Sequence, residues 1–245
     1  LNDSVWIPNF FKRITYKILV ACGFGRRATV EMLRRAGEGQ PIFWGGAEAF
    51  THSAKIKLLA PKLRTRFQNT TSWEVIEPIR RRFLSKRKKS ENLNWMTYLD
   101  LNLRLPELLL MRVDKMTMAV GLEARVPFLD HRLVEHALAV PESIKTRQGK
   151  LKYLLKCSLQ GVISNRVMNR KKQGFGLPLH DWLIDGFDIE ARRFVDEFVE
   201  GTGLLDPRGV AELFESNPGD VRVWFLLNLA LWWKHYFTDA RYSNR

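Results

Sequence analysis

The stretch RVDKMTMAVGLEARVPFLDHRLVEHAL, residues Arg112–Leu138, decides the fold. Apolar residues recur at helical spacing on both sides of its centre, which is typical of two amphipathic helices that pack against a core. Gly121 is a residue type that commonly ends a helix, and Asp130 is a type that commonly caps the next one. The sequence therefore predicts two helices joined by the short connection GLEARVPFLD (121–130).

An acid and a base stand two residues apart within this connection. Glu123 and Arg125 directly precede the apolar turn VPFLD (126–130). A charge pair placed there either braces the junction between the two helices or lines a site. The residues by themselves leave both interpretations open.

Helical periodicity also dominates the rest of the chain, and no long stretch alternates apolar and polar residues with a period of two. Pro61 should end a helix within EAFTHSAKIKLLA (48–60), and TSWE (71–74) fits a capping box that opens another. Asp206 and Pro207 are a typical helix start. The final stretch DVRVWFLLNLALWWKHYF (220–237) is apolar on most sides, so we expect it to be deeply packed. The fold class predicted is mainly α.

The chain of 245 residues carries a formal net charge of +14. A nucleic acid, a membrane surface, a phosphate-rich substrate or a missing acidic portion of a larger chain would each explain this charge. Its densest basic run, RRRFLSKRKK (Arg80–Lys89), is most simply a solvated face. The composition changes near residue 90 from basic and irregular to regular and apolar, without marking a domain boundary.

Cysteine and histidine usage argues against a metal site or a disulfide framework. Cys22 and Cys157 are the only cysteines and lie far apart, which suits a reducing cytosol. His131 and His136 are five residues apart, not the four that place two ligands on one helical face. The paired glycines of WGGAEAF (44–50) lack the spacing of a phosphate loop and predict a turn. No apolar run is long enough to span a bilayer.

The segment NRKKQGFGLPL (169–179) places three cations before Gly174 and Gly176. Such a loop can hold a lysine rigidly against a phosphate, because glycines allow the backbone to approach closely. Composition by itself favours a basic surface turn.

Taken in order, the blocks around LEARVPFLDH, GKLKYLLKCSL, KQGF and WFLLNLALWWKHYF resemble the C-terminal part of the glutamine-hydrolysing asparagine synthetases. The resemblance runs from about Trp95 to the C-terminus. Residues 1–90 resemble the family weakly, through WGGAEAF and KLLAP. We therefore expect residues 1–245 to be the helical C-terminal part of an asparagine-synthetase-type domain, with 91–245 its better matched portion.

The resemblance implies an enzyme with two parts. An N-terminal glutaminase releases ammonia, and a synthetase domain of the adenine nucleotide α-hydrolase-like (ATP pyrophosphatase) α/β type uses ATP and Mg²⁺ to adenylate the side-chain carboxylate of aspartate. Ammonia then displaces AMP. This chain has no SGGxDS phosphate loop, no GEGADE-like acidic loop and no N-terminal cysteine nucleophile. We therefore expect it to be part of a longer polypeptide whose other regions bind most of the ATP and magnesium, and to be inactive alone.

The resemblance also assigns residues to the site. Lys172 of KQGF would be the fixed cation beside the departing pyrophosphate, where negative charge builds up. Glu107 stands where the family often has an acid that can pair with this lysine, and Asp114 and Lys115 lie nearer the expected substrate side. Gly174 would support the lysine loop.

Glu123 and Arg125 are then interpreted mainly as a buried, mutually satisfied pair that fixes the junction behind the site, with direct catalysis as the alternative. No residue is assigned to a metal ion.

The expected partners are aspartate or a related carboxylate, glutamine-derived ammonia and a glutaminase domain of the same chain, in the cytoplasm. A homodimer is left open, and we expect neither a membrane nor a nucleic acid as partner. One alternative function is a related amidotransferase that acts on another carboxylate in cell-surface polysaccharide, antibiotic or β-lactam synthesis. Others are a basic helical nucleic-acid-binding module and a scaffold that has lost the chemistry.

Overall fold

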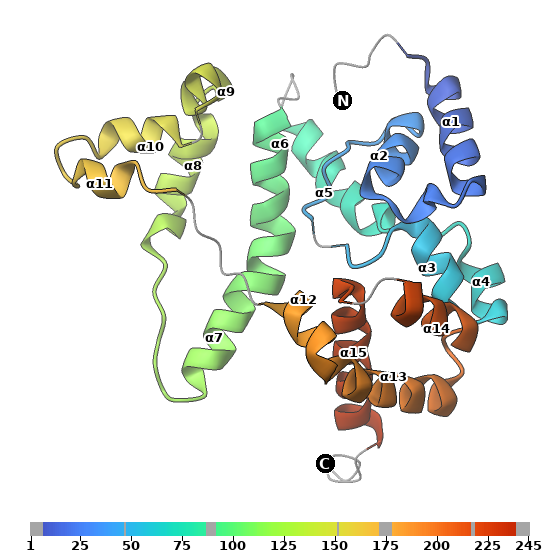
Figure 1. Cartoon of the computed structure of the whole chain (residues 1–245). Helices are drawn as coiled ribbons and strands as arrows, with labels where there is room; N and C mark the ends of the chain where they lie inside the picture. Colours follow the sequence, from blue (N-terminus) through green and yellow to red (C-terminus); the bar gives the residue numbers. More distant parts are fainter. Residues whose placement is uncertain are drawn as a thin grey trace. The chain divides into compact units, whose positions relative to one another are not determined.

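The computed structural model describes residues 7–46, 48–86, 92–150, 152–171, 178–216 and 219–238. Within these ranges the regular structure is helical, and the only β contacts are two isolated bridges. The prediction of a mainly α fold is therefore confirmed (Figure 1). None of the described helices is long and apolar enough to cross a lipid bilayer.

The chain divides into two compact units, and both are built from separate segments of sequence. Unit 1 comprises Leu1–Ile42, Glu48–Thr71 and Gly176–Arg245, and unit 2 comprises Phe43–Ala47 and Ser72–Phe175. The helices of unit 1 are α1 (Asn9–Ala21), α2 (Ala28–Gly37), α3 (His52–Leu58), α4 (Pro61–Phe67), α12 (Leu179–Trp182), α13 (Asp188–Thr202), α14 (Pro207–Ser216) and α15 (Val221–Trp233). Phe24–Arg26 forms a 3₁₀ turn, and π-helical segments span Leu183–Phe187 and Lys234–Thr238.

The core of unit 1 forms where α13, α14 and α15 pack together. Along α15, Val223, Leu226, Leu227 and Ala230 are buried and recur at helical spacing. The opposite side of the same helix is exposed, with Trp232 49% accessible. The expectation that this apolar helix is deeply packed is thus correct for one face and wrong for the other, because a helix on the rim of a core buries a single stripe.

Residues far apart in the sequence close unit 1. Leu59 and Leu205 form an antiparallel bridge, the amide of Ala60 donates to the carbonyl of Leu204 (3.0 Å), and the amide of Asp206 donates to the carbonyl of Leu58 (2.8 Å). The start of α14 is therefore fixed against the end of α3.

Gly209 of α14 faces this junction, and we expect that it cannot be replaced by a larger residue. A Cβ at this position would overlap the backbone carbonyl of Lys57, an atom that cannot move without shifting α3. Gly209→Ala should lower the free energy of unfolding by about 1–3 kcal/mol. Gly201→Ala is the control, because Gly201 is also helical and a Cβ there would meet nothing within 4 Å. That variant should gain up to about 1 kcal/mol, and urea unfolding of both tests the contrast.

Unit 2 is built around α5 (Trp73–Ser85) and the long helical rod that follows it. Its other helices are α6 (Asn92–Leu99), α7 (Met111–Met118), α8 (His131–Ala139), α9 (Glu142–Lys145), α10 (Tyr153–Ser158) and α11 (Asn165–Met168). A π-helical segment, Asp100–Leu110, joins α6 to α7, and Pro127–Leu129 and Arg147–Gly149 are 3₁₀ turns. The core residues of unit 2 are Trp44, Ile76, Ile79, Phe83, Trp95 and Leu99.

Several predicted helix boundaries are found in the structure. Pro61 opens α4 directly after α3 has ended, Gly121 adopts a left-handed φ of +71° after α7, and the Asp130 carboxylate accepts a bond from the amide of Arg132 (3.0 Å) at the start of α8. Asp206 caps α14 in the same way through Arg208 (2.9 Å). Short polar side chains and prolines therefore fix these helix ends locally.

The helix predicted to open at TSWE is found, because α5 begins at Trp73 and the backbone of Ser72 is already helical (φ −62°, ψ −10°); Ser72 makes no side-chain capping bond. Tertiary packing also holds the first turn of α5, since the Trp73 ring stacks on Trp44 at 5.7 Å. The region before residue 90, expected to be irregular apart from its two predicted helices, contains α1 to α5.

Candidate functional site

The rod from α6 to α7 carries three of the residues predicted for the site. Glu107 lies in the π-helical segment, and Asp114 and Lys115 lie on α7; all three are exposed. Pro106 has no amide proton, and the amide of Met111 reaches back five residues to the Pro106 carbonyl, which widens the helix at this point. Among the described residues, no hydrogen bond or ion pair joins Glu107 to Asp114 or Lys115.

Lys172 and Gly174 lie outside the described residues. The two cations that precede them, Arg170 and Lys171, are described and exposed. Whether Lys172 contacts Glu107 therefore stays a prediction from the resemblance.

Glu123 and Arg125 form the predicted ion pair, with 2.9 Å between Arg125 Nη2 and Glu123 Oε1. The expectation that the pair is buried is wrong, because the Arg125 and Glu123 side chains are 81% and 67% accessible. The connection between α7 and α8 has no regular secondary structure from residue 122 to 126 and leaves both side chains in solvent. An ion pair this exposed contributes little to stability, so its interpretation as support for the site stays a prediction.

Lys152 was not singled out by the sequence, although the structure makes it conspicuous. Its φ of +57° is the only positive value among the described residues other than glycine. A side chain in this left-handed conformation costs about 1 kcal/mol or more, and such residues cluster at ligand sites. The only signal in the sequence was the surrounding charge, since residues 145–171 contain eight lysines and arginines and no acid.

This acid-free segment, residues 145–171, is called the basic lobe below. It runs from α9 through α10 and α11 and leads directly into the predicted lysine loop. Lys145 is engaged, because its Nζ donates to Asn94 Oδ1 at 2.7 Å. Lys150, Lys152, Lys156 and Lys171 are exposed. Such a concentration of positive charge attracts polyanions and suits a ligand that carries several phosphates.

The basic run at Arg80–Lys89 differs from the basic lobe, because two of its described arginines contact aromatic and polar side chains of unit 2. The Arg80 guanidinium stacks over the Trp95 ring at 4.7 Å, and Arg82 donates to the Tyr98 hydroxyl and to Asn102 Oδ1, both at 3.0 Å. These arginines therefore pack α5 against α6. Their engagement weakens the interpretation of this run as a nucleic-acid interface.

The glycine pair of WGGAEAF forms the predicted turn. Gly45 and Gly46 adopt φ values of +80° and +62°. A Cβ on Gly45 would lie 3.7 Å from the Asp100 carboxylate, and one on Gly46 would lie 3.9 Å from the Arg104 guanidinium. Burial raises the pKa of Asp100, and Arg104 opposes that effect. A carboxylate beside the turn disfavours binding of a phosphate there.

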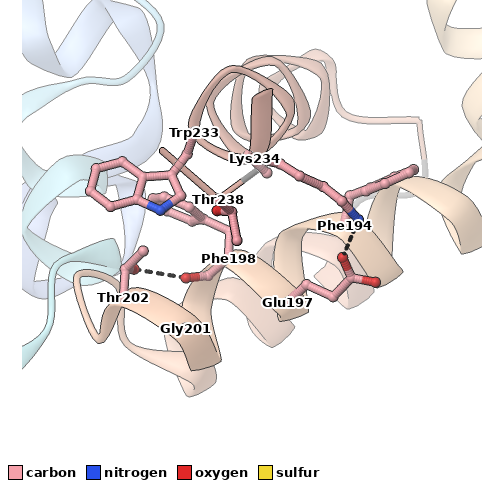
Figure 2. Close-up of a pocket in the computed structure, with 9 residues that line it drawn as sticks. Phe194, Glu197, Phe198, Gly201, Thr202, Trp233, Lys234 and Thr238 are labelled. Atoms are coloured by element: carbon pink, nitrogen blue, oxygen red, sulfur yellow. Dashed lines mark hydrogen bonds and ion pairs between the residues drawn. The ribbon is translucent and has the colours of Figure 1, made fainter. Parts of the chain in front are cut away.

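A pocket of about 230 Å³ lies within unit 1 between α13 and α15 (Figure 2). Glu197 and Lys234 form an ion pair of 2.9 Å at its edge, and the hydrogen bond from Lys234 lowers the pKa of Glu197. The Lys234 ammonium also lies 4.9 Å from the Phe194 ring. Its charged groups satisfy one another, and the pocket is smaller than the roughly 300–1,000 Å³ of typical ligand sites. None of the residues predicted for the site lines it, so we assign it a structural role.

Comparison with known proteins shows the family of this chain. A family model described as asparagine synthase matches residues 19–234. The chain is 28% identical to glutamine-hydrolyzing asparagine synthetase 1 of Bacillus subtilis, over 92% of this chain and 35% of that protein. It is 26% identical to a putative glutamine-hydrolyzing asparagine synthetase of Mycobacterium tuberculosis, over 95% of this chain and 35% of that protein. A shorter match, 39% identical, covers 44% of this chain and 19% of the asparagine synthetase of Gallus gallus.

The helical fold and these matches place the chain in a family of ligase-type enzymes. The chain belongs to the asparagine synthase family. It spans about a third of the length of the curated relatives that cover most of it. No solved structure gives a significant match.

Proposed function

We propose that this chain is the helical part of a cytoplasmic, glutamine-dependent and AMP-forming ligase that converts the side-chain carboxylate of aspartate to an amide. The family match over residues 19–234 carries the proposal, and relatives named as glutamine-hydrolyzing asparagine synthetases support it. Regions outside this chain would supply the glutaminase and the loop that holds the ATP phosphates.

The proposed reaction has two steps. A carboxylate oxygen of aspartate attacks the α-phosphorus of ATP, forming a mixed anhydride with AMP while pyrophosphate leaves. Ammonia released from glutamine then attacks the activated carbonyl carbon, and AMP departs with the bonding electron pair. Both steps place negative charge on phosphoryl oxygens, where a fixed cation stabilises the transition state.

Five side chains of this chain would act on that charge and on the substrate. Lys172 would stabilise the departing pyrophosphate, and Glu107 would pair with and orient it. Asp114 and Lys115 would contact the aspartate. Lys152 would add a second cation for the phosphates, since it is exposed in the basic lobe and held in a costly conformation.

Magnesium, when bound, would neutralise phosphate charge. Among the described residues, no group of three or more histidine, cysteine, aspartate or glutamate side chains could hold a metal ion. We therefore assign no described residue to magnesium and no step to it.

The identity of the carboxylate that is converted to an amide distinguishes this proposal from the alternative of a related amidotransferase. The native polypeptide that carries this chain should be supplied with ATP, magnesium and glutamine, and AMP release should be measured with aspartate and with other carboxylates. The proposal requires AMP and asparagine to form in equal amounts and only when aspartate is present. Turnover with a different carboxylate would establish another amide product, and the absence of AMP with every acceptor would refute the reaction class.

Lys152 gives a test that separates conformation from chemistry. Lys152→Gly should raise the free energy of unfolding by about 0.5–1 kcal/mol, because glycine adopts the left-handed conformation without strain. The same variant should lower the rate of AMP formation about tenfold or more, because a phosphate contact is lost. Lys150→Gly is the control, since Lys150 has an ordinary extended φ of −75° and gains no relief of strain. A Lys152→Gly variant with the wild-type rate would exclude the phosphate role.

A further inference from the structure

The outer side of the first helix exposes a continuous row of large apolar side chains. These are Ile7, which lies two residues before α1, and Phe10, Phe11, Ile14 and Ile18, with accessible fractions of 50%, 66%, 58%, 38% and 56%. At 100° per residue the four positions within the helix fall within an arc of about 100°. We call this surface the α1 ridge.

The α1 ridge faces away from the rest of its unit. The opposite side of α1 packs on α2, with Tyr16, Leu19 and Val20 half-buried. Arg13 fixes this arrangement, because its Nε donates to the carbonyl of Gly37 at the end of α2 (2.8 Å). The described residues of this unit therefore leave the ridge uncovered, and a contiguous exposed apolar surface marks an interaction site.

Positive charge borders the ridge. Helix α1 contains Lys12, Arg13 and Lys17 and no acidic residue. Lys17 follows Phe10 by two turns and so flanks the ridge directly. Beyond the end of α1, the Arg27 guanidinium lies 4.6 Å from the exposed Phe24 ring, which continues the same pairing of cation and aromatic group.

The nearest acidic side chains on α2 do not neutralise this charge. Glu31 is buried with Arg34 and Arg35, and Glu38 is paired with Arg34 at 2.8 Å. Among the described residues, the ridge therefore combines exposed aromatic and aliphatic groups with cations on the same helix that form no ion pair.

We propose that the α1 ridge binds the surface of an anionic lipid bilayer, with the axis of α1 in the plane of the membrane. Charge complementarity favours this partner, because lysines beside an apolar helical face are attracted to acidic headgroups while phenylalanine enters the interface. The ridge is the outer side of a single helix and projects outward. A bilayer interface accepts such a shape directly, whereas a protein partner would need a matching groove. The proposal goes beyond the amide-forming reaction and replaces the expectation of no membrane partner.

Vesicle binding by the native polypeptide tests the proposal. Sedimentation with phosphatidylcholine vesicles that contain about a third phosphatidylglycerol should show binding at physiological ionic strength, and pure phosphatidylcholine should bind much less. The double variant Phe10→Ser/Phe11→Ser should weaken binding about tenfold or more, although the net charge is unchanged. Lys17→Gln should weaken it about fivefold, and only with anionic vesicles. Ile189→Ser removes an apolar side chain on α13 that is 73% accessible and should leave binding unchanged.

Three results would overturn the proposal. Equal binding of the double variant and wild type would show that the net charge of +14 acts nonspecifically. A wild type that fails to bind anionic vesicles, with amides of α1 that resist hydrogen exchange, would show that another part of the polypeptide covers the ridge. A wild-type dimer that does not bind vesicles and that the double variant dissociates would assign the ridge to a second copy of the chain.

Discussion

Replacing Lys172 by alanine should lower the rate of amide synthesis by the native polypeptide at least about a hundredfold, while glutamine hydrolysis stays largely intact. The ammonium charge is needed where pyrophosphate leaves, and losing one such contact typically costs a few kcal/mol of barrier. The glutaminase would be a separate site and does not use this charge. Release of AMP and pyrophosphate, measured beside glutamate formation from glutamine, separates the two activities.

Two further variants show whether one lysine or a diffuse charge is responsible. Lys172→Arg should restore only part of the rate, because a planar guanidinium does not place its charge where a compact ammonium does. Lys171→Ala is the matched control, since Lys171 is adjacent, equally charged and exposed, so that solvent screens it. Equal losses in Lys171→Ala and Lys172→Ala would show that the whole basic lobe acts together and would refute the assignment of a single residue.

Replacing Glu31 by alanine should lower the free energy of unfolding by about 3 kcal/mol, because it removes the buried carboxylate that two buried arginines share and leaves Arg34 with Glu38 and Arg35 with Glu48, which are both more exposed. Glu31 is 2% accessible, Arg34 is 5% and Arg35 is 8%. One oxygen, Oε1, accepts from Arg34 Nε and Nη2 at 3.0 and 2.6 Å and from Arg35 Nε at 3.4 Å. Urea unfolding followed by circular dichroism measures the loss.

The same helix supplies the control for this prediction. Glu38 pairs with the same arginine at 2.8 Å, but its side chain is 38% accessible, so solvent replaces the interaction when it is removed. Glu38→Ala should cost less than about 1 kcal/mol. If the two variants lost similar stability, burial would not be what makes the Glu31 interaction strong.

The helices and several of their ends could be predicted from local signals in the sequence. Pro61, Asp130 and Asp206 act through their own backbone or side chain on the adjacent turn, so residue type is sufficient there. TSWE indicated the start of α5 to within two residues, whereas the stacking of Trp73 on Trp44, almost thirty positions earlier, could not be predicted from it. Tertiary packing of this kind leaves no local pattern.

The sequence indicated which residues belong to the candidate site, but it did not indicate their solvent exposure or their backbone conformation. Resemblance indicated Lys172, Glu107 and Asp114, whereas the exposure of Glu123 depends on what covers the connection and cannot follow from two adjacent charges. The left-handed backbone of Lys152 was equally hidden, because lysine has no preference for that conformation. The buried charges of α2 were missed as well, since glutamate and arginine on a helix normally indicate a solvated face.

The Leu59–Leu205 bridge has a consequence for the order in which this protein forms during synthesis. The N-terminal segments of unit 1 pack on its C-terminal helices, because α3 contacts the start of α14. These segments therefore cannot complete unit 1 until most of the chain has left the ribosome. Almost all of unit 2 lies between those segments, so it is translated completely before α14 appears. Domains generally fold as they emerge, and contacts between distant residues form late. Early helices such as α1 and α2 therefore wait as an incomplete intermediate, and that interval is when they most need protection from aggregation.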